Sequence, residues 1–102
     1  MRVEIIKNSV PVNDQLEDVI KQKSGKVEER LKRYHPDTAD LEIRLQHDAK
    51  NNEYGCALNL KAFRDSLHAH KNHAELRVAV DKSFEALFKE LDHYRAKINP
   101  TQ

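Results

Sequence analysis

The chain of 102 residues has the size of one domain with a single modest core, so we expect residues 1–102 to form one domain. Charged residues make up 34% of it, but the formal net charge is only +1, so the overall charge does not indicate a nucleic-acid binder. The lone cysteine, Cys56, excludes an intramolecular disulfide, and the N-terminal apolar residues are too few for a signal peptide or a membrane span. We therefore predict a cytoplasmic protein without a membrane segment.

The first strand and the first helix are predicted from a change in the spacing of apolar residues. Val3 and Ile5 alternate with polar residues, which is typical of a half-buried strand. From Asn13 or Asp14, either of which can cap a helix, apolar residues recur at helical spacing to about Tyr34. The chain therefore begins with a short strand that is followed by a long helix.

Gly25 lies in the middle of this predicted helix. A glycine there costs roughly 1 kcal/mol relative to alanine. We expect that a close approach of the helix to the sheet compensates for this cost.

The rest of the chain predicts three more strands and a second helix. Alternating apolar residues indicate strands at 41–47, 54–63 and 66–70, with a hairpin turn at 48–52. From about residue 73 to Ile98 the apolar spacing becomes helical. The predicted order is β-α-β-β-β-α in the α+β class, with two helices on one face of a four-stranded sheet. The other sheet face is left to solvent or to a partner.

Basic residues are placed unevenly on the two predicted helices. Residues 21–35 contain six Lys or Arg residues against two Glu residues, and helical spacing stacks one set of them on one side, namely Lys26, Arg30 and Arg33 beside Lys23. The last helix has a stripe without carboxylates, which comprises Lys82, Ala86, Lys89, His93 and Lys97, next to a stripe with Asp81, Glu85 and Asp92. Two parallel basic ridges suit a phosphate backbone. Charged helix faces are, however, often only solvated.

No catalytic constellation is visible in the sequence. It contains only two glycines and has no glycine-rich phosphate loop and no recognised nucleophile or zinc-protease motif, so we predict no enzyme activity, no catalytic residues, no cofactor and no small-molecule substrate. Cys56 alternates with inward-facing leucines and is predicted to be a small buried side chain rather than a nucleophile. His68, His70 and His73 form a weak metal-ligand pattern, but we favour exposed histidines that contact solvent or phosphate, and we predict no metal.

Several short motifs in this order resemble the ribosome hibernation promoting factor family, which includes the ribosome-associated translation inhibitor and the sigma-54 modulation proteins. They are Val27-Glu28-Glu29-Arg30-Leu31-Lys32-Arg33-Tyr34, then Ser66-Leu67-His68-Ala69, then Ala79-Val80-Asp81, followed by Leu87, Leu91 and a basic tail at His93, Arg95 and Lys97. The resemblance spans nearly the whole chain. It is to the short form, so we expect the second, C-terminal domain of the long form to be lacking.

The resemblance implies a fold similar to double-stranded-RNA-binding domains and a site between head and body of the small ribosomal subunit. There the protein would occupy the place of messenger and transfer RNA, and thereby inhibit translation in idle or stressed cells. The implied partner is the small subunit with its 16S rRNA, and the expected rRNA contacts are Lys23, Lys26, Arg30, Arg33, Lys82, Lys89, His93, Arg95 and Lys97. Three positions depart from the family pattern, namely Ala86, Glu90 and Asp92, and we expect them to weaken binding.

Two other functions remain open from the sequence. A member of this fold that lacks strong RNA affinity would bind a protein partner through the sheet face, where Phe63, Arg44, Lys61 and His70 are the residues to test. A metal-binding module would instead use the three histidines at 68, 70 and 73.

Overall fold

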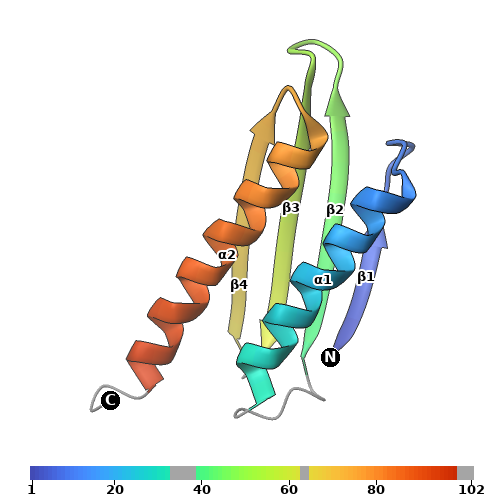
Figure 1. Ribbon diagram of the computed structural model, residues 1–102. Helices are drawn as coiled ribbons and strands as arrows, with labels where there is room; N and C mark the ends of the chain where they lie inside the picture. Colours follow the sequence, from blue (N-terminus) through green and yellow to red (C-terminus); the bar gives the residue numbers. More distant parts are fainter. Residues whose placement is uncertain (33–38, 63–64, 99–102) are drawn as a thin grey trace.

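The computed structural model describes residues 1–32, 39–62 and 65–98, and for 95–98 it describes the course of the backbone only. The elements follow the predicted order β-α-β-β-β-α (Figure 1). Their bounds are β1 Arg2–Ile6, α1 Asp14–Leu31, β2 Asp40–Asp48, β3 Glu53–Ala62, β4 Asp65–His73 and α2 Leu76–Ile98. The predicted α+β class is therefore confirmed.

The sheet has the strand order β1-β2-β3-β4. β1 and β2 are parallel, because α1 connects them, whereas β2, β3 and β4 form an antiparallel meander. Both helices lie side by side over the same face of the sheet and run in the same direction (Figure 1). This arrangement places the N-termini of both helices at one end of the molecule and leaves the opposite sheet face uncovered.

The core lies between the helices and the covered sheet face. Period-two alternation turns Leu41, Ile43 and Leu45 of β2 toward the helices, and all three are at most 1% exposed. The helices supply the remaining large buried side chains, which are Ile20, Val27 and Leu31 of α1 and Val80, Phe84, Leu87 and Leu91 of α2. Ser83 ties α2 to the sheet, because its hydroxyl donates a 2.6 Å hydrogen bond to the Cys56 carbonyl.

Local signals set the ends of two elements. Asn13 is the N-cap of α1, as predicted, and its Oδ1 accepts a 2.8 Å hydrogen bond from the Leu16 N–H. The hairpin between β2 and β3 is closed by Asp48, whose carboxylate accepts hydrogen bonds from the backbone and side chain of Asn51. These bonds hold the pKa of Asp48 below its usual range. Asn52 follows in the left-handed region, with φ of 51°.

The expected close approach at Gly25 is wrong. Gly25 lies on the exposed side of α1, and a Cβ atom added there would meet nothing within 4 Å. The turn of the helix that packs on the core presents Ser24 and Val27 instead.

Element bounds differ from the prediction mainly at β4. This strand runs to His73, three residues beyond the predicted end, because Lys71, Asn72 and His73 continue the pairing with β3. Lys71 is exposed although its register partner on β3 is the buried Cys56. The predicted continuation of the first helix to Tyr34 lies outside the described residues.

Candidate nucleic-acid interface

The predicted basic ridge of α1 divides into one free cation and two paired cations. Lys26 is exposed and has no ion pair within the described residues. Lys23 and Arg30 are turned toward α2 and are less accessible, with side chains 25% and 37% exposed. The predicted contact Arg33 lies outside the described residues.

Two carboxylates of α2 receive the paired cations of α1. The Nζ atom of Lys23 lies 3.4 Å from Asp81 Oδ1. One helical segment further on, the Arg30 guanidinium donates a 2.9 Å hydrogen bond from Nη1 to Asp92 Oδ1. The line where the two helices face each other, which we call the interhelical seam, is therefore charge-neutralised.

Arg30 is fixed by a second contact in the seam. Its guanidinium carbon lies over the Phe88 ring at 4.4 Å from the ring centroid. Phe88 is half-buried and packs against the core, so it provides a firm support. The Arg30 side chain is therefore held by an aromatic face and a carboxylate together.

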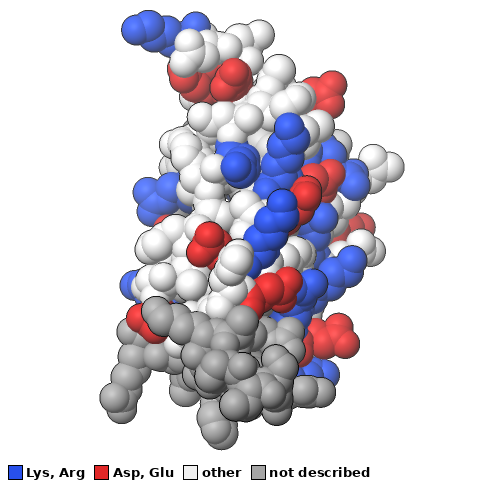
Figure 2. Space-filling view, turned by 90° about the vertical axis from the view of Figure 1, so that its left-hand side faces the viewer, with Lys and Arg blue, Asp and Glu red and all other residues white. Residues whose placement is uncertain are grey.

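The predicted basic ridge of α2 is exposed. Lys82, Lys89 and His93 follow each other at intervals of seven and four residues, so they lie along one side of the helix. Figure 2 shows Lys and Arg side chains gathered on the helix side of the molecule, with Asp and Glu side chains between them. The remaining predicted contacts, Arg95 and Lys97, belong to α2, but their side chains lie outside the described part.

The two predicted ridges do not form one continuous basic surface. The stripe of α2 that contains Asp81 and Asp92 faces α1, and Lys82 and Lys89 lie beyond it on the solvent side. The structure thus brings Lys23 and Arg30 close to carboxylates, and leaves Lys26 on one side of them and the α2 lysines on the other.

Arg77 is a cation of the seam that the sequence interpretation did not include. Its Nε lies 3.3 Å from Asp81 Oδ2, so Asp81 bridges Arg77 and Lys23. The spacing of four residues between Arg77 and Asp81 on one helix was a signal for this pair.

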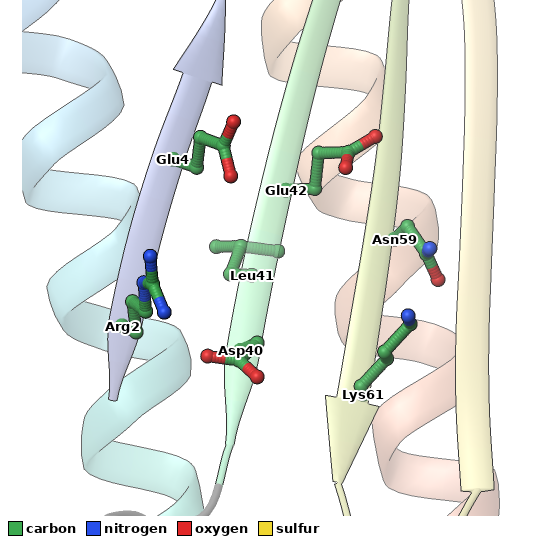
Figure 3. Close-up of a pocket in the computed structure, with 7 residues that line it drawn as sticks. All are labelled: Arg2, Glu4, Asp40, Leu41, Glu42, Asn59 and Lys61. Atoms are coloured by element: carbon green, nitrogen blue, oxygen red, sulfur yellow. The ribbon is translucent and has the colours of Figure 1, made fainter.

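The uncovered sheet face carries polar side chains of both signs. A shallow depression of about 210 Å³ lies on it across β1, β2 and β3 (Figure 3). The register places Asp40 between Arg2 and Lys61, and it places Glu4 beside Glu42. The depression is lined by Arg2, Glu4, Asp40, Leu41, Glu42, Asn59 and Lys61. It is therefore neither apolar nor of one charge.

The three histidines of the possible metal site do not converge. His68 and His70 are exposed and alternate on the open sheet face, whereas His73 follows at an odd spacing and lies on the helix side. The Nδ1 of His73 accepts a 3.0 Å hydrogen bond from the Glu75 N–H at the start of α2. Within residues 1–32, 39–62 and 65–94, no three histidine, cysteine or acidic side chains are grouped to hold a metal ion.

Cys56 is buried, as predicted. Burial raises the pKa of its thiol to about 11, and a side-chain hydrogen bond with Ser83 opposes the rise. A thiol that holds its proton this firmly is a poor nucleophile at neutral pH. None of the helices in the described part is long and apolar enough to span a membrane.

Comparison with known proteins connects this fold to one family. The model of the family described as sigma 54 modulation protein / S30EA ribosomal protein matches residues 3–99. A search of curated proteins found no match.

Two solved structures share the fold. A ribosomal subunit interface protein from Coxiella burnetii gives a TM-score of 0.74 over 94% of this chain and 99% of that chain, with 16% sequence identity. The N-terminal domain of Protein Y from Thermus thermophilus gives a TM-score of 0.70 over 92% of this chain and 99% of that chain, with 17% identity. The family match extends over nearly the whole sequence, which confirms the resemblance inferred from the short motifs. The chain belongs to the sigma 54 modulation protein / S30EA ribosomal protein family.

Proposed function

We propose that this protein is a ribosome-binding hibernation factor of the cytoplasm. It occupies the region of the small subunit where messenger and transfer RNA bind, and it inhibits translation in idle or stressed cells without catalysis. The family match over residues 3–99 carries this proposal. The fold shared with a protein described as a ribosomal subunit interface protein supports it.

The helix side of the molecule is the proposed rRNA surface. Lys26, Lys82 and Lys89 are exposed there and have no ion pair within the described residues, so their ammonium groups can meet phosphates at once. Lys23 and Arg30 belong to the same surface but are paired with carboxylates. His93, together with Arg33, Arg95 and Lys97, completes the proposed set of contacts.

Co-sedimentation with purified small subunits across a salt series tests this proposal. The wild type should saturate near one copy per subunit, and its binding should weaken steeply as salt increases, because bound phosphates release counterions. The variant Lys26→Glu/Lys89→Glu should bind at least about tenfold more weakly and show a flatter dependence of log K on log salt.

A charge-matched control separates a site from general repulsion. Lys21→Glu/Lys50→Glu makes the same change of charge at two exposed positions, one on the other side of α1 and one in the β2–β3 hairpin. The control should retain most of the affinity. Absence of wild-type binding at low salt would refute the proposed function, and equal losses in both double variants would refute the proposed surface.

A protein-partner module is the second candidate, and the depression on the open sheet face favours it. Its charges of both signs suit a mixed-charge protein surface better than a phosphate backbone. Arg44→Glu/Lys61→Glu/His70→Ala should then remove the partner and leave subunit binding unchanged. Phe63, the fourth residue proposed for this face, lies outside the described residues. Recovery of one stoichiometric protein after nuclease treatment of a lysate, lost in this variant, would favour this function.

A further inference from the structure

The Arg30–Asp92 pair has the geometry of a phosphate contact. A guanidinium presents its N–H groups in a planar fork that fits a carboxylate and a phosphate equally well. In the seam the carboxylate takes this place, since Asp92 Oδ1 lies 2.9 Å from Arg30 Nη1. A phosphate oxygen that bound Arg30 from this side would have to replace the Asp92 carboxylate.

The two partners of this pair differ in how firmly they are held. Arg30 rests on the Phe88 ring and is 37% exposed, so its guanidinium stays in place when its ion pair opens. Asp92 is 58% exposed on the surface of α2, and no second cation holds it within the described residues. The pair therefore consists of a preformed cation and a carboxylate that can turn into solvent.

We propose that Asp92 is an intramolecular competitor that sets the phosphate affinity of the α1 ridge. In the free protein its carboxylate neutralises Arg30. When RNA approaches, a phosphate displaces the carboxylate, and Arg30 exchanges one anionic partner for another. Asp92 thus lowers the affinity and keeps binding reversible. This inference rests on the proposed function, because it takes RNA phosphate as the ligand of the helix side.

The same exchange applies to Lys23 in weaker form. Asp81 contacts Lys23 at 3.4 Å and also Arg77 at 3.3 Å, so it remains partly neutralised when Lys23 leaves. Asp92 has a single cationic partner in the described residues and lies closer to it. The effect of removing the charge is therefore expected to be larger at position 92.

The test uses the substitution Asp92→Asn and a short RNA duplex of arbitrary sequence as the probe. Removing one unit charge about 4 Å from a bound phosphate changes affinity roughly fivefold at low salt. Asp92→Asn should therefore bind the duplex about fivefold more tightly in fluorescence anisotropy. Its log K should also depend more steeply on log salt, because Arg30 becomes an additional phosphate contact.

Glu90→Gln is the matched control. It makes the same change of charge two residues away on the same helix, at an exposed side chain without an ion pair in the described residues. Its affinity for the duplex should change by less than about twofold. Equal gains in the Asp92 and Glu90 variants would overturn the proposal, since general repulsion would then explain both.

A double-mutant cycle with Arg30→Gln identifies the mechanism. If Asp92 acts by occupying Arg30, Asp92→Asn gains nothing once Arg30 is removed. A gain that persists in the Arg30→Gln background would overturn the proposal, and so would a failure of all variants to bind the duplex. Urea unfolding midpoints of the variants verify that each one is folded.

The proposed function is judged separately, by co-sedimentation with small subunits. A protein that does not bind subunits but shows the Arg30-dependent gain on the duplex would retain the competitor and lose the hibernation function. Subunit binding without that gain would give the opposite result.

Discussion

The guanidinium carbon of Arg30 lies 4.4 Å from the centre of the Phe88 ring, so a cation of α1 rests on an aromatic side chain of α2. Such contacts stabilise a fold by about 0.5–1 kcal/mol when they are partly exposed. We expect a coupling free energy of about this size between Phe88→Leu and Arg30→Gln in a double-mutant cycle of urea unfolding.

Phe88→Tyr is the control for this prediction, because it keeps an aromatic ring under the guanidinium. In the same cycle it should leave the coupling with Arg30 nearly intact. A coupling close to zero for Phe88→Leu would mean that the two side chains are neighbours without a net attraction.

Gly25→Ala should raise the free energy of unfolding by about 0.5–1 kcal/mol. The new methyl group meets nothing within 4 Å, so the helix gains backbone rigidity without a clash. Chemical denaturation of the purified variant measures the gain.

Gly55→Ala gives the opposite sign and serves as the comparison. At Gly55 a Cβ would lie 2.7 Å from Asn72 Oδ1 and 3.0 Å from Gln46 Cγ, so both side chains must move. A loss of about 1 kcal/mol is expected. If Gly25→Ala were also destabilising, α1 would have to approach another part of the chain at this position.

The stability of the protein should fall between pH 9 and pH 11 because of Cys56. Burial raises the pKa of its thiol from the ordinary value of 9.0 to about 11 in the folded state. The folded state therefore holds the proton more tightly, and this contribution is complete below pH 9 and lost as the pH rises toward 11. The full loss is of the order of 2–3 kcal/mol.

Cys56→Ala removes the titrating group and should flatten this part of the stability profile. The measurement is urea unfolding at several pH values for both proteins. Parallel profiles would mean that other groups cause the alkaline loss. Thiol reagents at pH 8 should also react with the wild type only as fast as it unfolds.

Asn52 should tolerate glycine but not a β-branched residue. Its φ of 51° lies in the left-handed region, which glycine adopts freely and valine does not. Asn52→Gly should leave the free energy of unfolding within about 0.5 kcal/mol of the wild type, and Asn52→Val should lower it by about 1–2 kcal/mol. Equal stability of both variants would indicate that the hairpin changes its turn.

Local patterns were sufficient for most of the fold. Asn13 was predicted as a cap because a short polar side chain there precedes apolar residues at helical spacing, and the bond to Leu16 confirms it. The alternation around Leu41, Ile43 and Leu45 gave the buried face of β2 directly. The exposed side of Gly25 was misjudged, because the role of a glycine in a helix depends on which face it occupies.

The candidate site was predictable only in part. Lys26, Lys82 and Lys89 were expected at the surface, and they lie there. The pairing of Lys23 with Asp81 and of Arg30 with Asp92 joins residues 58 and 62 positions apart. It depends on how far the two helices lie from each other and on their rotation about their axes. Neither quantity follows from the spacing of residues within one helix.

Lys71 has a consequence for how the molecule behaves in concentrated solution. It is exposed on the helix side of β4, and β4 forms one edge of the described sheet. A foreign strand that paired with this edge would have to cover the ammonium group with its own side chains, which is costly without a carboxylate partner. Lys71 therefore protects the edge of the sheet against aggregation, at a strand that is otherwise open to pairing.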